Sequence, residues 1–289
     1  MDTNKFVDVI IPVKERYNLL LIALKSIKNQ SLKPRKVWII DDCSNEKISN
    51  FPKYPFEIVL LRNKTNRGPS YSCNLAARKS NAKYIAILET DDTWKPKKLE
   101  KQLKLAQKEN LDFVYCNYLL NKRRNTQKFT NDKKQLFNFL LQKWSCPNPS
   151  TFFLKRKSFL KIKGFDEKMI GSHDLDLWIR ITQSNFKINY IKDFLVTIED
   201  YNPNQMSRDY KTRIKSINTF LLKYQKTIIK SKNYQFFISY KRELLSRALI
   251  PCLKKALIDI DILGLIVIIR HLLISKLFYK RLKSFFLKY

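Results

Sequence analysis

The sequence is poor in glycine and histidine. Only 4 of its 289 residues are glycine and only 2 are histidine. A loop that wraps phosphate groups needs closely spaced glycines, and the N-terminal apolar segment VIIPVKER contains none. This absence disfavours a nucleotidyltransferase that makes nucleotide sugars. That class is still an alternative to consider, because it shares an α/β layout and an acidic metal site.

Cysteines are few and scattered. The chain has 5, an odd number, and no C-x-x-C motif; they are Cys43, Cys73, Cys116, Cys146 and Cys252. This spacing argues against a disulfide framework and a zinc site, and it favours a reducing compartment.

Long apolar stretches are absent. None reaches the roughly 18 residues of a membrane span, and the best candidate, residues 262–269, lies between Asp261 and Arg270. The N-terminus carries Asp2 and Lys5 and runs directly into an apolar segment, unlike a signal peptide. We therefore expect a cytoplasmic protein that does not cross a membrane.

Acidic residues are outnumbered. The chain has 25 Asp and Glu against 57 Lys and Arg, a formal net charge of +32. Such an excess points to a nucleic acid, an anionic membrane surface or a phosphorylated substrate. A non-catalytic basic module that binds nucleic acid or membrane would fit the charge alone. It would leave the acidic clusters described below unexplained, and nucleic acid is not expected as the partner.

Short apolar segments alternate with helical patterns through about residue 205. The first, VDVIIPV, is apolar at nearly every position, as in a strand covered on both faces. The alternation predicts an α/β domain with a Rossmann-like, mostly parallel sheet and flanking helices. The expected strands are Val7–Val13, Lys36–Ile40, Phe56–Leu61, Tyr84–Leu88, Asp112–Tyr118 and Phe152–Leu154. The expected helices are Leu19–Gln30, Ser70–Ser80, Lys97–Asn110 and Phe137–Trp144, with Lys122–Lys134 as a mobile loop.

Carboxylates gather where two of these strands end. Glu89, Asp91 and Asp92 follow the fourth strand, and Asp42 follows the second. Like charges so close need a counter-charge, and a hard cation such as Mg²⁺ or Mn²⁺ takes oxygen ligands and often brings a phosphate. The alternative is an acidic loop exposed to water. The place at the carboxyl end of a buried strand favours a ligand site.

A second acidic feature is the segment HDLDLWIR at 173–180. Leu177, Trp178 and Ile181 form one apolar helical face, and Asp174 lies in the first turn. An acid there can be catalytic, or it can merely stabilise the helix dipole by about 0.3–1 kcal/mol.

The composition shifts after about Tyr201. Residues 206–289 hold 19 Lys and Arg and 4 Asp and Glu, net +15, against net +17 for the other 205 residues. The tail is expected to be helical and to lie on an anionic membrane surface. The alternative is a basic helix packed on its own domain. In its last segment, one face holds Phe278, Leu282, Phe285 and Tyr289, and another holds Lys276, Lys280 and Lys283.

Seven motifs follow one another in the first 200 residues: VDVIIPV, KSIKNQS, KVWIIDDCSNE, NRGPSYSCNLA, YIAILETDDTW, GFDE and HDLDLWIR. In this order and spacing they resemble the family-2 glycosyltransferases, inverting enzymes with the GT-A fold that include bacterial surface-glycan transferases. The resemblance covers about residues 5–200, so 1–205 is expected to be the catalytic domain and 206–289 the tail.

The resemblance implies a nucleotide-sugar donor, UDP favoured, and a divalent metal ion, Mn²⁺ or Mg²⁺. It implies transfer of a hexosyl or N-acetylhexosaminyl group to a glycan or lipid-linked acceptor in polysaccharide or lipopolysaccharide synthesis. Together with the tail, this suggests a peripheral location on the inner face of the cell membrane.

Carried over by position, the resemblance gives roles to individual residues. Asp42 would hydrogen-bond the nucleotide base, and Asp91 would meet the ribose or the metal. Asp92 would ligate the metal, and Asp174 would be the catalytic base. A cation such as Arg67 would stabilise the leaving diphosphate. The end of the first strand would line the nucleotide cleft with Pro12, Lys14, Glu15 and Arg16.

Four positions depart from the family pattern. Glu89 stands where Asp is usual, Cys43 replaces a Gly, Glu15 replaces an Asn, and His173 replaces the Glu before the base. These departures affect the expected donor and metal geometry more than the expected activity.

Overall fold

The computed structural model describes residues 6–124, 130–143, 145–199, 210–232 and 234–258, together with Ile266 and Ile269. The chain divides into two compact units. The first comprises Met1–Leu140, Ser145–Glu167 and Asp174–Tyr201, and the second Leu141–Trp144, Lys168–His173 and Asn202–Tyr289.

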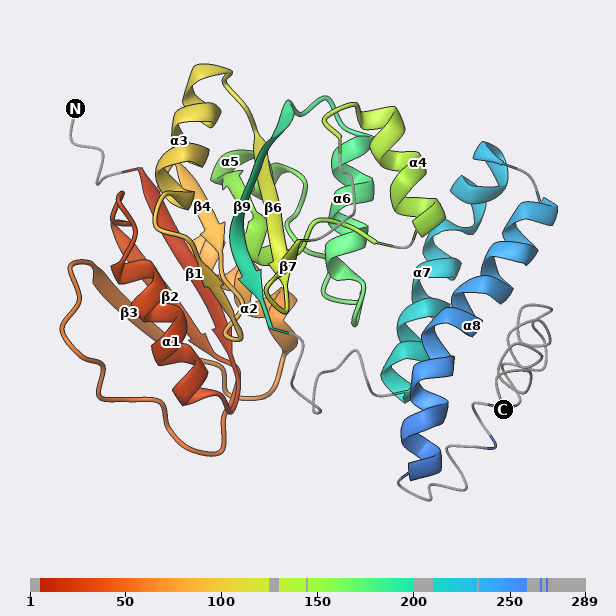
Figure 1. Cartoon of the computed structure of the whole chain (residues 1–289), viewed down its shortest axis with the longest axis horizontal. Coiled ribbons are helices and arrows are strands. Elements are labelled where there is room, and N and C mark those ends of the chain that lie inside the picture. Colours follow the sequence, from red (N-terminus) through yellow and green to blue (C-terminus); the bar gives the residue numbers. More distant parts are fainter. Residues whose placement is uncertain are drawn as a thin grey trace. The chain divides into compact units, whose positions relative to one another are not determined.

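The first unit is built on one nine-stranded sheet (Figure 1). Its strands are β1 (Val7–Val13), β2 (Lys36–Asp41), β3 (Glu57–Arg62), β4 (Tyr84–Ile87), β5 (Asp92–Trp94), β6 (Phe113–Leu120), β7 (Arg123–Arg124), β8 (Phe153–Lys155) and β9 (Ile188–Ile198). The order is β3-β2-β1-β4-β8-β6-β9-β5, with β7 paired to β6. The strands from β3 to β4 are parallel, which confirms the expected Rossmann-like half. Beyond β4 the sheet is mixed, because β8 and β5 pair antiparallel with their neighbours.

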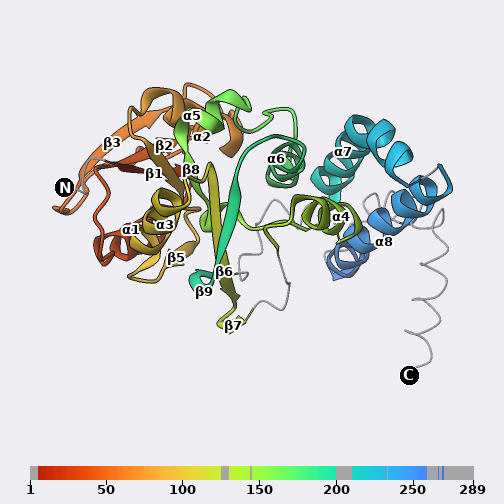
Figure 2. The same ribbon diagram turned by 90° about the horizontal axis from the view of Figure 1, so that it is seen from above.

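Helices cover both faces of this sheet. Figure 2 shows α2 and α5 on one face and α1 and α3 on the other. The helices of the first part of the chain are α1 (Tyr17–Lys28), α2 (Gly68–Lys79), α3 (Lys98–Lys108), α4 (Lys133–Lys143), α5 (Arg156–Lys161) and α6 (His173–Thr182), with a 3-10 turn, η2 (Pro149–Thr151). Burial from both sides explains why β1 is buried at every position but Pro12 and β4 at all of its positions.

The sequence pattern does not predict β9. Its segment INYIKDFLVTI is interrupted by Lys192 and Asp193, which are exposed. These two residues bulge out of the ladder, because Cys116 of β6 pairs with Ile191 and Asn117 already pairs with Phe194. The bulge hides the strand periodicity.

The prediction of a loop over Lys122–Lys134 is wrong at both boundaries. Arg123–Arg124 forms β7, and α4 begins at Lys133, four residues before the predicted Phe137. Residues 125–129 lie outside the described residues. Asp132 explains the early start of α4, since its Oδ1 accepts the backbone N–H of Gln135 at 2.8 Å, as an N-cap does.

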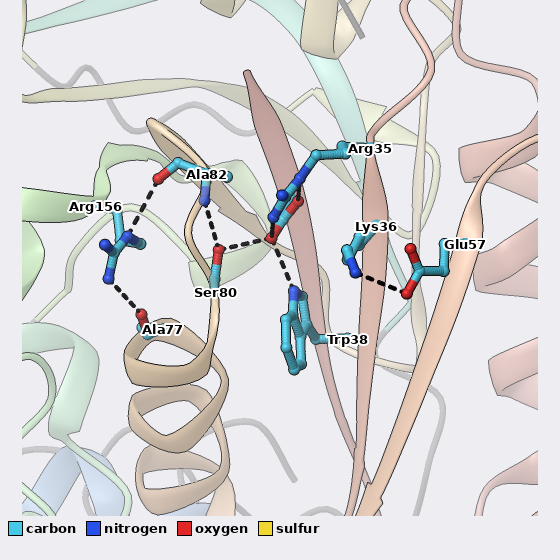
Figure 3. A network of polar contacts seen from close by, with 9 residues as sticks. Arg35, Lys36, Trp38, Glu57, Ala77, Ser80, Ala82 and Arg156 are labelled. Atoms are coloured by element: carbon cyan, nitrogen blue, oxygen red, sulfur yellow. Dashed lines mark hydrogen bonds and ion pairs between the residues drawn. The ribbon is translucent and has the colours of Figure 1, made fainter. Parts of the chain in front are cut away.

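Asp8, the second residue of β1, is a buried acid at the amino end of that strand, and Figure 3 shows the polar contacts around Arg35, Trp38 and Ser80. Asp8 is 0% exposed and accepts two hydrogen bonds from the guanidinium of Arg35, at 2.9 and 2.7 Å. The indole of Trp38 and the hydroxyl of Ser80 also donate to it, at 2.8 and 2.6 Å. Four donors satisfy this carboxylate, and they join β1 to β2 and to the end of α2.

The second unit contains the helices α7 (Tyr210–Ser231) and α8 (Tyr234–Ile258), which pack on each other. Buried side chains of this unit include Phe220, Tyr224 and Ile228 on α7 and Tyr240 and Leu244 on α8. No helix among the described residues is long and apolar enough to cross a membrane. The amphipathic segment expected over residues 276–289 lies outside the described residues.

Candidate active site

The three acids after β4 lie in a tight turn. The backbone N–H of Asp92 donates to the carbonyl of Glu89 at 3.1 Å, and β5 then pairs antiparallel with β9. β4 is a central strand, parallel to β1, which is parallel to β2. The acids therefore share one edge of the sheet with the carboxyl ends of β1 and β2, where open α/β sheets bind ligands.

Asp92 is turned into the protein. It is 2% exposed, and its Oδ2 accepts a hydrogen bond from the Ser150 hydroxyl at 2.5 Å. Burial raises the pKa of its carboxyl well above the ordinary value, and the charges of Glu89 and Asp91 raise it further. A cation near this side chain would therefore favour its ionised form.

Asp91 faces the end of β1. Its Oδ2 accepts a hydrogen bond from the guanidinium of Arg16 at 2.6 Å, and both side chains are part-exposed. The structure thus brings together two residues that the sequence analysis assigned to one nucleotide site, although 75 positions separate them.

Glu89 lies in a concentration of negative charge. Burial, followed by the carboxylates of Asp91 and Asp174, raises the pKa of Glu89 to about 8, against the opposing effects of Asn148 and Arg16. The amide of Asn148 donates to Glu89 Oε2 at 3.0 Å. The charge of Asp174 acts on Glu89, so the second acidic motif lies within electrostatic range of the first.

Asp174 is half-buried in the first turn of α6. Its neighbours include Cys146, whose thiol it hydrogen-bonds; burial and the charge of Asp174 raise the pKa of that thiol well above its usual range. Tyr118 also faces this group, because Cys146, Asp92 and Asp174 add to burial in raising the pKa of its phenol to about 12. A part-exposed carboxylate can accept a proton from a hydroxyl bound beside it.

Asp176 has a different environment. It is 0% exposed, and its Oδ2 accepts from Arg180 Nε at 2.8 Å and Nη2 at 2.7 Å. Arg180 also donates to the carbonyls of Ile162 and Gly164, each at 2.7 Å. This pair ties α6 to the turn after α5, so its contacts are structural.

Asp42 lies at the start of α2 and is 4% exposed. Its carboxylate accepts the backbone N–H groups of Arg67 and Gly68, at 2.8 and 2.7 Å, and the amide of Asn63 at 2.8 Å. An anion at a helix N-terminus is stabilised by the helix dipole. Asp42 therefore fixes the start of α2, in addition to any contact with a nucleotide base.

The residues at the carboxyl end of β1 lie at the same edge of the sheet as the acids. Pro12 is half-buried, and Lys14 and Glu15 are exposed. The Glu15 backbone N–H donates to the Ser44 hydroxyl at 3.0 Å, and its Oε1 accepts the Asn45 N–H at 2.5 Å. The loops that follow β1 and β2 are thus tied together.

Two of these loop positions have a left-handed backbone. Glu15 has φ +54° and Cys43 has φ +63°. For Cys43 this explains the family pattern, because glycine adopts this conformation without the steric cost that a side chain carries. The Arg67 guanidinium, predicted to meet a diphosphate, lies 4.2 Å from the ring centroid of Tyr71.

The donor set fits a hard cation by its chemistry. Glu89, Asp91 and Asp92 offer oxygen ligands, which Mg²⁺ and Mn²⁺ prefer, and burial together with neighbouring carboxylates raises the pKa values of Glu89 and Asp92. Among the described residues, no three His, Cys, Asp or Glu side chains are already grouped in a metal-binding arrangement.

Sequence reasoning did not single out Cys146, Asn148 or Ser150, which contact Asp174, Glu89 and Asp92 respectively. The one available signal is the rigid turn PNPST at 147–151, which the pattern assigns only a connecting role.

Comparison with known proteins gives a consistent result. The family model described as glycosyl transferase family 2 matches residues 8–163. An uncharacterized glycosyltransferase of Methanocaldococcus jannaschii is 32% identical over 209 residues, 68% of this chain and 71% of the relative. The Escherichia coli enzyme WfgD, a UDP-Glc:alpha-D-GlcNAc-diphosphoundecaprenol beta-1,3-glucosyltransferase, is 26% identical over 183 residues, 62% of this chain and 70% of that enzyme.

Solved structures of similar fold include residues 1–349 of Staphylococcus aureus TarS in complex with UDP-GlcNAc. The TM-score is 0.58 at 14% sequence identity, with 86% of this chain and 81% of that chain covered. The likeness is one of fold, and it confirms the GT-A architecture expected from the motifs.

Proposed function

This chain belongs to glycosyl transferase family 2, and we propose that it is an inverting, metal-dependent enzyme that transfers a sugar from a UDP-sugar to a hydroxyl of a glycan or lipid-linked acceptor. Membership of the family establishes glycosyl transfer as the reaction. The identity of the donor, the use of a metal ion and the class of acceptor are proposed. The observation that supports it is the concentration of negative charge after β4, where Glu89, Asp91 and Asp92 lie in one turn and the charge of Asp174 acts on Glu89.

Two similarities support UDP as the nucleotide. TarS has been solved with UDP and with UDP-GlcNAc, and the similar E. coli enzyme uses UDP-Glc. In this chain the nucleotide would lie along the ends of β1 and β2, near Pro12, Lys14, Glu15 and Asp42. Arg16 and Arg67 supply positive charge for the diphosphate.

The proposed reaction is a single displacement. The acceptor hydroxyl attacks the anomeric carbon from the face opposite the diphosphate, its proton passes to Asp174, and the bond from the sugar to the diphosphate oxygen breaks. The nucleoside diphosphate leaves with the bonding electron pair, so the anomeric configuration inverts. No second protein acid is required, because the diphosphate is a good leaving group.

Asp91 and Asp92 would hold the divalent cation, which supplies positive charge for the leaving diphosphate. Arg16 already neutralises part of the charge on Asp91. Burial of Asp92 and its hydrogen bond from Ser150 hold this carboxylate in one orientation.

The acceptor is proposed to be lipid-linked, in cell-surface polysaccharide or lipopolysaccharide synthesis. The diphosphoundecaprenol in the name of the similar E. coli enzyme supports this class. Residues 1–205 would be the catalytic domain. The basic tail over 206–289 would bind the inner face of the membrane, bringing the enzyme to its acceptor.

A thermal-shift screen with MnCl₂ and UDP-, GDP- or dTDP-sugars tests the donor. A ligand that binds only the folded state raises the melting temperature by mass action, and UDP-sugars should give the largest rise. The Asp91→Asn variant should lose the part of the shift that depends on Mn²⁺. A larger shift with GDP- or dTDP-sugars would overturn the UDP assignment, and an unchanged Mn²⁺ response in Asp91→Asn would overturn the assignment of Asp91 as a metal ligand.

A further inference from the structure

The acidic turn after β4 is held by a segment about 60 residues further along the chain. Ser150, in η2, is 0% exposed and contacts both ends of the turn. Its hydroxyl accepts the backbone N–H of Glu89 at 2.9 Å and donates to Asp92 Oδ2 at 2.5 Å. One hydroxyl thus sets the spacing between the end of β4 and the start of β5.

A serine hydroxyl has one proton and two lone pairs. At Ser150 the proton is used on Asp92 and a lone pair on the Glu89 N–H, so the rotamer of this side chain is fixed by two bonds of opposite polarity. Replacing the hydroxyl would leave a buried N–H without its acceptor and a buried carboxyl without its donor.

The turn that carries Ser150 is itself anchored. The backbone carbonyl of Ser150 accepts the indole N–H of Trp94 at 2.8 Å. The backbone N–H of Ser150 donates to Asn148 Oδ1 at 2.7 Å. The carbonyl of Thr151 accepts the amide of Gln102 at 2.8 Å. Asn148 also donates a hydrogen bond to Glu89. Because residues 148–151 are held by these other contacts, they can fix the positions of the acids.

We propose that Ser150 is a positioning residue for the donor site: it holds Asp92 and the Glu89–Asp92 turn in the arrangement that receives a nucleoside diphosphate with its cation. This inference rests on the proposed function. Ser150 is wholly buried and acts through the carboxylates, so it is not a catalytic residue.

The test compares two serines in similar surroundings. Ser158 is 6% exposed, and its hydroxyl also donates to a carboxylate, that of Asp112. Asp112 precedes the amino end of β6, whereas β7 pairs with the carboxyl end of β6. Ser150→Ala and Ser158→Ala each remove one such bond. UDP binding is measured by titration calorimetry, with MnCl₂ and with EDTA, on the full chain.

Ser150→Ala should bind UDP with Mn²⁺ about 10–100-fold more weakly than the wild type, the usual effect of losing a partner that orients a metal ligand. Ser158→Ala should bind within about twofold of the wild type despite the same chemical change. If Ser150→Ala does not fold, Asn148→Ala takes its place, because it removes the bond to Glu89 from a part-exposed position.

Wild-type affinity in a folded Ser150→Ala, or in Asn148→Ala where the first variant fails, would overturn the inference while the proposed function stands. Equal losses in Ser150→Ala and Ser158→Ala would also overturn it, since they would reflect general destabilisation. No binding of UDP by the wild type would overturn the proposed function, and the inference with it.

Discussion

The two carboxylates on α6 illustrate how surroundings assign roles to single residues. Asp174 faces Cys146 and Glu89, whereas Asp176 is buried against Arg180. A proton acceptor needs access to the acceptor hydroxyl, and only Asp174 is part-exposed.

We therefore expect Asp174→Asn to bind UDP normally and to lower kcat by roughly 10²-fold or more, the scale of general-base catalysis. Asp176→Asn should instead lower stability, by about 3 kcal/mol or more, because it leaves Arg180 without its buried partner. Steady-state kinetics and urea unfolding of both variants distinguish the two roles. Near-full turnover in Asp174→Asn would contradict the assignment, and loss of UDP binding would make Asp174 a structural cap.

Lys98 is a buried lysine beside Trp94. It is 0% exposed; its Nζ donates to Gln102 Oε1 at 2.8 Å and lies 3.9 Å from the ring centroid of Trp94. Burial lowers the pKa of Lys98 to about 7. In the unfolded chain its pKa is about 10.4, so between these values the unfolded state binds the extra proton and stability rises with pH.

Compared with Lys98→Met, the wild type should gain up to about 1.4 kcal/mol of unfolding free energy per pH unit between pH 7 and 10. Subtracting the unfolding free energy of Lys98→Met from that of the wild type removes the contributions of other titrating groups. Urea unfolding at pH 7, 8 and 9 measures both free energies. Lys104→Met, at an exposed position of the same helix, should show a constant difference from the wild type. A constant difference for Lys98→Met as well would mean that Trp94 keeps the lysine protonated.

At the scale of elements, a buried charge cluster joins neighbouring elements at the amino edge of the sheet. Asp8 joins β1 to Arg35, Trp38 and Ser80, and it is fully buried. Nearby in Figure 3, Lys36 and Glu57 join β2 to β3 through an ion pair of 2.7 Å that is largely exposed.

Asp8→Asn should destabilise the protein by about 3 kcal/mol or more, because Arg35 loses a buried partner. Glu57→Gln should cost about 0–1 kcal/mol, the range for exposed ion pairs. Denaturant unfolding of both variants measures the contrast. Equal costs would show that the Asp8 cluster contributes no more than a surface pair.

At the scale of the whole molecule, the positive charge is distributed unevenly. α7 carries six Lys and Arg and no Asp or Glu over Tyr210–Ser231. A basic residue near an anionic surface contributes about 1 kcal/mol to binding. If the second unit binds the membrane, charge reversal there should matter more than the same reversal on the first unit.

We expect the full chain to co-sediment with vesicles containing phosphatidylglycerol, and less with neutral vesicles or at high salt. A triple reversal to Glu on α7 should lower this binding about 100-fold or more. Those positions are Lys215, Lys226 and Lys230, all exposed. The matched control reverses Lys25, Lys28 and Lys53, which are exposed on the first unit, and should retain most of the binding. Equal losses would indicate general attraction by net charge rather than a membrane-binding tail.

The sequence by itself determined the α/β class, most strand positions and the acids at the strand ends. These features are local: an apolar run such as Val7–Val13 reports its own burial, and the acids that follow β4 are adjacent in the chain. Helix and strand ends were predicted within a few residues for the same reason. The bulged strand β9 was not, because its periodicity is broken by two exposed residues.

Only the tertiary structure decided which acid has which partner. Ser150 reaches Asp92 across 58 positions, and the fold brings Asp174 within electrostatic range of Glu89. The tertiary structure also gave Asp174 and Asp176 different surroundings, although the two residues look alike in the sequence. Such contacts depend on how strands far apart in the chain pair, and a burial pattern read along one segment carries no record of that pairing.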